Sequence, residues 1–420
     1  MITLGIVSFF VLMLLGMPIW AAMLISGAII ILDIGLPMQA VVSNMFIAID
    51  SWLLLAVPFF LLAGNFMTEL GLAGRLFRFI ENLLGHLRGG LPATGVVTCA
   101  IFGALSGSST ATVVAVGSML LPYMMRAGYD RRDALGVIAV SGTLGQMVPP
   151  SIYMILFAAI AQLDVSKLFL AGIVPGLLIT VLLVMTAVAL SWYGKQELRP
   201  RASGRVLWQS FLAALPALVM PGLVLGGIYS GIFTPTEAAA VAVAYVLVIS
   251  AIFEWKTFTL KRLIASTESA VGTTTVIFII LGGATIFANA LTFASIPQDF
   301  TAFMTSLPVS EHIAMAMILV LFIVLGTMLD PVPILYITIP IVYPVVLALG
   351  YEPTHFAILT IACMMIAQVT PPIGMSLFAL SGYFNVPISE VMRGSLPYLG
   401  TLVLALIILW LWPGLSNVTG

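Results

Sequence analysis

The chain has 420 residues, of which 61% are hydrophobic and 7% are charged, and its formal net charge is −1. Soluble domains carry about 25% charged residues, so this composition excludes a soluble globular protein and indicates an all-α polytopic membrane protein. The net charge says nothing about partners, and no basic run suggests a nucleic-acid partner. Because the chain has no GK[ST] phosphate loop, HExxH or GxSxG motif, we expect no enzyme activity.

Residues 3–32 are apolar and contain the tripeptide 16–18, Gly-Met-Pro, near their middle. They make either two short crossings that turn at this tripeptide or one tilted helix, since a single crossing needs about 20 apolar residues. Two crossings keep the count at five in this half of the chain. Residues 37–49 follow as an interfacial arm, and a third crossing precedes Arg75.

Lys and Arg fall into four clusters, and short loops rich in these residues stay cytoplasmic. Two of the clusters flank residues 91–123, so this segment has to enter and leave the membrane on the same side. We therefore predict a re-entrant hairpin or a tight pair of short helices, with the small and polar stretch 103–112 at its tip. The clusters are Arg75, Arg78 and Arg88; Arg126, Arg131 and Arg132; Lys195, Arg199, Arg201 and Arg205; and Lys256, Lys261 and Arg262.

A double proline, Pro149–Pro150, interrupts the next apolar segment, 134–163. Proline inside a helix removes a hydrogen-bond donor and clashes with the preceding turn, so we predict a broken helix that crosses outward. Residues 168–192 then return to the cytoplasmic side. The first repeat is expected to cover residues 1–193, followed by a cytoplasmic linker at 194–206.

The second half, residues 207–420, is expected to repeat this order from the other side of the membrane. It contains an amphipathic stretch at the external interface, a second hairpin, and a second helix that is broken by Pro371–Pro372. The predicted segments are two crossings at 207–233 and 236–254, an arm at 255–265, a crossing at 264–294, the interfacial stretch at 295–311, the hairpin at 312–349 with its tip at 326–333, the broken helix at 354–383 and a last crossing at 395–413.

An internal repeat supports this organisation. Pro122 and Pro344 are 222 positions apart, and Gln146 and Gln368, like the two double prolines, keep the same offset. Five crossings in each half place the halves in opposite orientations, which is the inverted-repeat architecture of secondary transporters. We therefore predict an inverted repeat of two five-helix halves with two re-entrant hairpins.

The two hairpin tips and the two breaks are expected to lie near the middle of the bilayer, where discontinuous helices expose carbonyl oxygens to cations. Sodium is a hard cation that prefers oxygen ligands, so we predict two or more sodium ions and no other metal. The predicted sodium ligands are Ser106, Ser108, Ser109, Gly142, Thr143 and Gly145 in the first half and Gly326, Thr327, Asp330, Gln368 and Thr370 in the second.

Few positive charges lie at this depth to neutralise an organic anion. Bound sodium, hydroxyl groups and the positive ends of half-helices would have to bind it instead. The predicted substrate contacts are Asn65, Ser108, Thr110, Pro149, Pro150, Pro371 and Pro372.

Each motif also has a purely structural interpretation. Runs of small residues often serve close helix packing, and a proline often marks only a kink. The pairing of the motifs at one offset favours the functional interpretation. Asp330 is an ionisable residue at membrane depth and so a functional candidate, with the capping of a half-helix as the alternative.

Several motifs carry a resemblance to a known family. The stretches PFFLLAGNFM (58–67), GHLRGGL (85–91), GTLGQMVPPSI (142–152) and GTMLDPVPILYITIPIVYP (326–344) resemble the large membrane subunit of TRAP transporters, the tripartite ATP-independent periplasmic systems. This resemblance runs over nearly the whole chain. It implies an elevator-type, sodium-driven importer of organic acids, such as sialic acid or four-carbon dicarboxylates, that is multi-pass in the bacterial inner membrane.

The same resemblance implies a small four-helix membrane subunit and a periplasmic substrate-binding protein as partners, besides membrane lipid. Because the chain starts directly at the large-subunit motifs, we expect the small subunit to be a separate polypeptide. Both hairpins and both broken helices would move as one domain against a scaffold of arms and outer helices. Two alternatives are a stand-alone sodium–dicarboxylate symporter that needs no binding protein and a channel.

Overall fold

The computed structural model describes residues 2–35, 37–192 and 200–417. Over these residues the chain is helical and contains no strand. Seven of the described helices are long and apolar enough to cross a membrane, and an eighth span results if the bent pair Arg131–Met147 and Ile152–Ala161 is counted as one. The prediction of an all-α polytopic membrane protein is therefore confirmed.

The N-terminal apolar stretch folds as two helices rather than one. α1 (Ile2–Leu14) and α2 (Ile19–Asp33) pack against each other, and Gly16 between them has a φ of +82°. Glycine adopts this left-handed backbone region at little cost, so the chain can turn sharply before Pro18. Of the two interpretations of residues 3–32, the structure supports the helical pair.

The remaining helices are as follows. The first half continues with α3 (Met38–Ile49), η1 (Trp52–Leu55), α4 (Ala56–Glu69), α5 (Leu72–Leu84), α6 (Gly90–Ser106), α7 (Ser109–Arg126), α8 (Arg131–Gly142), α9 (Leu144–Met147), α10 (Ile152–Ala161) and α11 (Val165–Ser191). The second half contains α12 (Gly204–Tyr229), α13 (Pro235–Phe253), α14 (Leu260–Phe293), α15 (Ile296–Ser306), α16 (Glu311–Gly326), α17 (Pro331–Ala348), α18 (Pro353–Ala367), α19 (Met375–Phe384), α20 (Ile388–Leu411) and η2 (Pro413–Leu415).

Helix boundaries recur at the offset found in the sequence. α7 and α17 both begin and end 222 residues apart, and α8 and α18 begin 222 residues apart. The peptide bonds Pro149–Pro150 and Pro371–Pro372 are both cis. These boundaries support the internal repeat, while the opposite orientation of its halves in a membrane stays a prediction. Of the predicted linker, residues 194–199 lie outside the described residues, and Gly204 already begins α12.

The predicted separation of an arm at 255–265 from a crossing at 264–294 is wrong. α14 is one continuous helix of 34 residues that contains most of both segments. At 1.5 Å per residue it is about 51 Å long, well above the hydrocarbon thickness of about 30 Å. No Gly or Pro occurs from Trp255 to Val271, so no residue in this stretch interrupts the helix. In the first half, by contrast, the backbone leaves helical geometry at Asp50 and Ser51, which separates α3 from the next helices.

A helix that the sequence analysis missed, α5, precedes the first hairpin. It buries Leu76, Phe77 and Ile80 on one face and exposes Arg78 on another. In the second half α15 occupies the equivalent place before α16, where the sequence predicts an amphipathic interfacial stretch. Each hairpin is thus preceded by a short helix.

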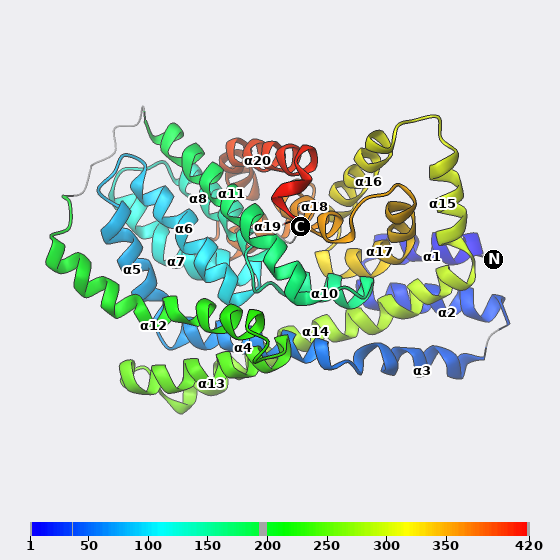
Figure 1. Ribbon diagram of the computed structural model, residues 1–420, viewed down its shortest axis with the longest axis horizontal. Helices are drawn as coiled ribbons and strands as arrows, with labels where there is room; N and C mark the ends of the chain where they lie inside the picture. The colour runs from blue at the N-terminus through cyan, green and yellow to red at the C-terminus, as the bar shows by residue number, and fades with distance from the viewer. Residues whose placement is uncertain (1, 36, 193–199, 418–420) are drawn as a thin grey trace.

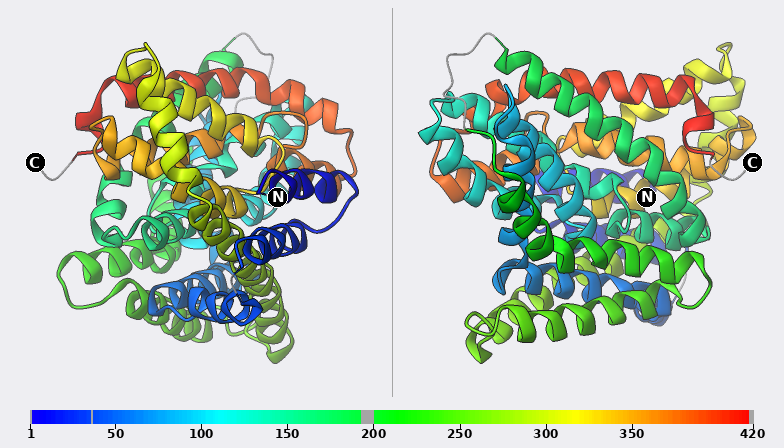
Figure 2. Two further views of the ribbon diagram at one scale, coloured as in Figure 1. Left: turned by 90° about the vertical axis from the view of Figure 1, so that its right-hand side faces the viewer. Right: turned by 60° about the vertical axis from the view of Figure 1, so that its left-hand side comes forward.

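The helices form two groups in Figure 1. α3, α4, α12, α13 and α14 run across the lower part of the molecule, whereas the hairpin and broken helices α6 to α10 and α16 to α19, together with α20, occupy the upper part (Figures 1 and 2). α14 runs along the boundary, in contact with α2, α3, α4 and α17.

The broken helix of the first half packs directly on the last helix of the second half. A Cβ atom added at Gly394 of α20 would lie 1.9 Å from the carbonyl oxygen of Arg132 on α8, and one added at Gly136 would lie 2.1 Å from the carbonyl carbon of Gly394. Only glycine permits this backbone contact. It holds α8 of the first half against α20 of the second half.

Candidate functional site

The first hairpin tip gathers oxygen atoms. The chain turns at Gly107, whose φ is +59°, and Ser108 caps α7 by accepting a hydrogen bond from the backbone N–H of Ala111. Ser106 Oγ lies 2.8 Å from Thr112 Oγ1, which in turn donates to the carbonyl oxygen of Ser108 at 2.7 Å. Hydroxyl and carbonyl oxygens therefore converge within one turn of the tip, and such oxygens suit a hard cation.

The second hairpin tip is built around Asp330. One carboxylate oxygen of Asp330 accepts a hydrogen bond from the backbone N–H of Val332 at 3.0 Å, so the residue does cap α17. The carbonyl oxygen of Thr327 accepts from the N–H of Ile373 at 3.1 Å. This bond fixes the second tip to the backbone just after the second double proline. The cap uses one of the two carboxylate oxygens and leaves the other for a further partner.

The two tips face each other across one cavity of about 290 Å³. Ser108 and Thr110 of the first hairpin and Asp330 of the second line it, together with Tyr153 of α10. α14 closes the opposite wall, where Thr273 is the polar lining residue. The cavity therefore lies between the hairpin tips and a helix of the lower group.

Beside this cavity, side chains from both halves form a buried hydrogen-bond network. Gln368 Oε1 accepts from Gln146 Nε2 at 2.5 Å and from Ser109 Oγ at 2.6 Å, and Ser376 Oγ lies 3.4 Å away. Gln146 and Gln368, which are 222 positions apart, are 0% and 1% exposed. One amide oxygen thus links the first hairpin tip to the segments around both breaks.

Each glutamine keeps one buried polar atom that is not satisfied by the described residues: Oε1 of Gln146 and Nε2 of Gln368. A buried acceptor or donor without a partner is costly, about 1–3 kcal/mol. In native proteins such groups are usually met by water, by an ion or by a second conformation.

The two double-proline breaks differ in exposure. Pro149 and Pro150 are buried, and the helices on either side of this break are bent by 42°. Pro371 and Pro372 are exposed. The two halves therefore do not present equivalent surfaces at their breaks.

The structure brings together part of the predicted sodium set. Ser108 and Asp330 line the cavity, and Ser106 lies at the first hairpin tip. Ser109 and Gln368 belong to the adjoining hydrogen-bond network. The hydroxyl groups of three threonines instead donate to carbonyl oxygens one turn earlier in the chain; these residues are Thr143, Thr327 and Thr370.

The predicted glycines lie at close helix contacts. A Cβ at Gly145 would lie 2.9 Å from Gly103 Cα, and a Cβ at Gly326 would lie 2.5 Å from the Cβ of Ala367. Gly142 is crowded by Val113 in the same way. Close packing accounts for these positions, and any ion contact there would come from backbone carbonyls.

Most of the predicted substrate residues lie elsewhere. Ser108 and Thr110 line the cavity, but Asn65 donates to the carbonyl oxygen of Ser266 on α14 at 3.4 Å and is not among the lining residues. None of the four break prolines is among the lining residues either.

Three residues of the site were not selected as site residues from the sequence. Gln146 was noted only as a repeat partner of Gln368, although two buried amides at one offset are a usable signal. Tyr153 and Thr273 lack a local motif, because their role depends on packing between segments far apart in the chain.

The chemistry of the cavity suits a cation. Asp330 is the only charged residue among the described lining residues, and the other polar ones offer hydroxyl groups. No group of three His, Cys, Asp or Glu side chains occurs among the described residues, so a transition-metal site has no support there. An alkali cation needs only such oxygen ligands.

Comparison with known proteins gives a consistent result. The family described as "Tripartite ATP-independent periplasmic transporter, DctM component" matches residues 6–415. The chain is 39% identical over 367 residues to the C4-dicarboxylate TRAP transporter large permease protein DctM of Pseudomonas aeruginosa, covering 87% of this chain and 86% of the relative. It is 32% identical to the sialic acid TRAP transporter large permease protein SiaM of Vibrio cholerae, covering 95% and 93%.

A third relative is the isethionate TRAP transporter permease protein DctMQ of Oleidesulfovibrio alaskensis, which is 35% identical over 94% of this chain and 62% of the relative. Among solved structures, the fold is similar to the YdaH transporter of Alcanivorax borkumensis, with a TM-score of 0.59 at 15% identity over 90% of this chain and 88% of that one. At this identity the structural likeness supports the fold alone.

Proposed function

The chain belongs to the DctM family of tripartite ATP-independent periplasmic (TRAP) transporters, and on this basis we propose that it is the large membrane subunit of a sodium-coupled, binding-protein-dependent importer of organic acids. Members of this family are transporter permeases and not enzymes. The observation that carries the proposal is the cavity at which the two hairpin tips, and with them Ser108 and Asp330, meet.

Sodium coupling is supported by the ligand chemistry of the tips. Two or more sodium ions would bind to hydroxyl and carbonyl oxygens near Ser106, Ser108 and Asp330. The charge of Asp330 favours a cation there. A bound cation would neutralise the charge of Asp330 and so remove its repulsion of an organic anion in the same cavity. Binding of the anion would thus depend on prior binding of the cation.

The substrate class follows from the relatives and the size of the cavity. The names of the relatives specify C4-dicarboxylates, sialic acid and isethionate. Ligand pockets usually measure about 300–1,000 Å³, so a cavity of about 290 Å³ favours the smaller acids, such as four-carbon dicarboxylates. Ser108 and Thr110 would hydrogen-bond the carboxylates.

An elevator mechanism is supported by the grouping of the helices. Both hairpins and both broken helices pack on one another, as where Ser109 and Gln146 donate to Gln368, and would move as one domain. α3, α4, α12, α13 and α14 would form the scaffold, with α5 and α15 as the connections to the hairpins. The repeat covering 1–193 and the one covering 207–420 would then lie in opposite orientations in the membrane.

The partners follow from the family. We propose a small four-helix membrane subunit, which would brace the scaffold, and a periplasmic substrate-binding protein, with the complex in the bacterial inner membrane. The fused name DctMQ of one relative is consistent with a second membrane component. Family membership does not favour the stand-alone symporter.

The test is reconstitution of the chain into proteoliposomes with and without the two other components, using radiolabelled succinate and radiolabelled N-acetylneuraminate. Uptake of one acid should require all three proteins, should saturate, and should stop when sodium is replaced by choline. Uptake by the chain alone would instead identify a stand-alone symporter. Uptake that does not saturate would identify a channel.

A further inference from the structure

A polar groove lies between α5 and the beginning of α12, away from the tip cavity. It consists of two adjoining cavities of about 430 and 400 Å³ that share Asn82 and Val206 as lining residues. The two helices are in contact along this stretch and lie at one end of the molecule (Figure 1). We call it the α5–α12 groove and define its polar lining by Arg78, Asn82, Gln209 and Ser210.

The spacing of these residues explains why they share the groove. Arg75, Arg78 and Asn82 are three and four positions apart and so lie on one face of α5. Gln209, Ser210 and the neighbouring lining positions on α12 follow the same spacing. The two polar faces oppose each other, and the fold thereby joins two basic clusters that are more than 100 positions apart in the sequence, with Arg201 lining the second cavity.

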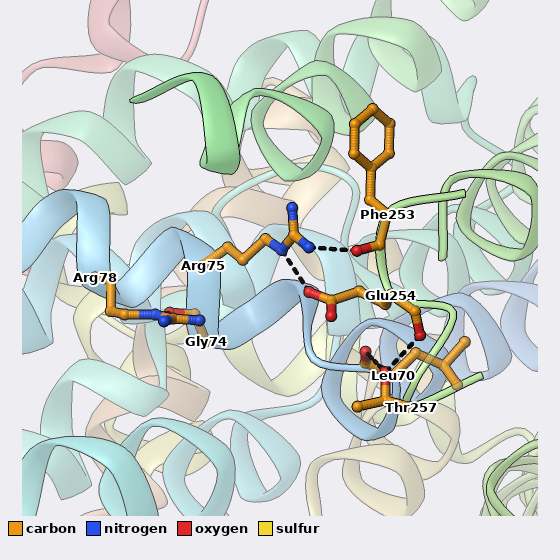
Figure 3. Close-up of polar contacts among 7 residues, drawn as sticks. All are labelled: Leu70, Gly74, Arg75, Arg78, Phe253, Glu254 and Thr257. Carbon is orange, nitrogen blue, oxygen red and sulfur yellow. Dashed lines mark hydrogen bonds and ion pairs between the residues drawn. The ribbon is translucent and has the colours of Figure 1, made fainter. Parts of the chain in front are cut away.

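The two arginines of α5 have different partners. Arg75 donates to the carboxylate of Glu254 and to the carbonyl oxygen of Phe253, so its charge is neutralised where α13 ends (Figure 3). Arg78 points back along α5 and donates through Nε to the carbonyl oxygen of Gly74 at 3.2 Å (Figure 3).

The described residues offer no hydrogen-bond partner to the remaining four N–H groups of Arg78, which lie on its two terminal nitrogens in a planar fork that matches the oxygens of a phosphate group. Two glutamates also line the two cavities. Glu254 is the partner of Arg75, and Glu81 is buried. Arg78 and Arg201 are thus the exposed cations that line the groove, and the amides of Asn82 and Gln209 line the same cavity as Arg78.

Large apolar side chains flank the polar lining. Trp208 and Leu212 on α12 are 60% and 48% exposed, and Leu83 on α5 is 42% exposed. Tryptophan is enriched at the level of lipid headgroups, and α12 enters its apolar stretch from here. A ligand in the groove would therefore meet a phosphate-binding group at one end and an acyl-binding surface at the other.

We propose that the α5–α12 groove binds the phosphate headgroup of an anionic glycerophospholipid, with Arg78 as the principal contact. Anionic lipids accumulate beside basic pockets on the cytoplasmic side of membrane proteins. The lipid would join α5, which connects to the first hairpin, to α12 of the lower group. The proposal concerns lipid binding and does not depend on sodium coupling or on the transported acid.

The test is native mass spectrometry of the purified full chain with dioleoyl-phosphatidylglycerol and dioleoyl-phosphatidylcholine, together with Arg78→Gln and the control Arg126→Gln. Arg126 is another exposed arginine, at the end of α7 and outside the groove. We expect the parent to prefer phosphatidylglycerol by about tenfold and Arg78→Gln to lose that preference, since a charge-assisted hydrogen bond is worth about one power of ten in affinity. Arg126→Gln should behave as the parent.

Several results would overturn the proposal. The proposal fails if Arg78→Gln prefers phosphatidylglycerol as strongly as the parent does. It also fails if the parent binds phosphatidylcholine as well as phosphatidylglycerol. Inorganic phosphate at the same concentration must not displace the lipid, because displacement would assign the groove to a free anion. Addition of the small membrane subunit must leave the lipid bound, because its loss would show that protein covers the groove.

Discussion

Replacing Asp330 by asparagine should abolish sodium-driven uptake while the protein still inserts and folds. Asparagine caps helices about as well as aspartate, so the hydrogen bond to Val332 is retained and only the negative charge is removed. Removal of one partner from a buried charge pair costs about 3–5 kcal/mol, which corresponds to a loss of roughly 100-fold or more in sodium affinity. The measurement is the initial rate of uptake by proteoliposomes that contain all three components.

Asp164→Asn is the matched control. Asp164 caps α11 by accepting from the N–H of Ser166 at 2.8 Å, but it is exposed and lies far from the tips in the sequence. This variant should transport at the rate of the parent. Full uptake by Asp330→Asn would assign Asp330 to the capping role alone.

Replacing Gln368 by alanine should lower both stability and the apparent affinity for sodium. The change leaves the donors of Gln146 and Ser109 buried without their acceptor, at a cost of about 1–3 kcal/mol each. Because the side-chain oxygen of Gln368 joins the first hairpin tip to the region of the second break, its loss should let these two segments move apart and weaken sodium binding between them. The measurements are thermal unfolding in detergent and the sodium concentration that gives half-maximal uptake.

A double-mutant cycle separates this linkage from simple damage. Gln146→Ala and Gln368→Ala should show an interaction free energy of about 0.5–3 kcal/mol, as side chains in direct contact do. Gln298→Ala removes an exposed amide on α15 and should change neither property. Additive effects of the two buried substitutions would mean that the glutamines act independently.

The sequence predicted those parts of the fold that have a local cause. Double prolines must interrupt a helix, so both breaks were located, and the offset of 222 placed the second hairpin once the first was recognised. The failures have equally local reasons. α14 continues across the predicted boundary between arm and crossing because no Gly or Pro occurs from Leu260 to Val271, whereas the repeat predicted a separate arm there.

The candidate site was less accessible from the sequence than the fold. Ser108 and Asp330 could be found because hairpin tips are recognisable, whereas Tyr153 and Thr273 join the cavity only through packing of distant segments. Asn65 was selected as a substrate contact, but its amide forms a hydrogen bond between α4 and α14. Likewise, Pro149 is buried and Pro371 is exposed although both lie in double-proline motifs, so the local sequence could not predict this difference.

The claim on which the account depends is that the paired tips form a cation site selective for sodium. Its most direct test is the thermal stability of the purified chain in sodium chloride and in potassium chloride at equal ionic strength. At a sodium concentration of about 100 times Kd, binding should stabilise the folded state by about 2.7 kcal/mol. This stabilisation should be absent in potassium and in Asp330→Asn, and present in Asp164→Asn. Equal stability of the parent in the two salts would contradict the account.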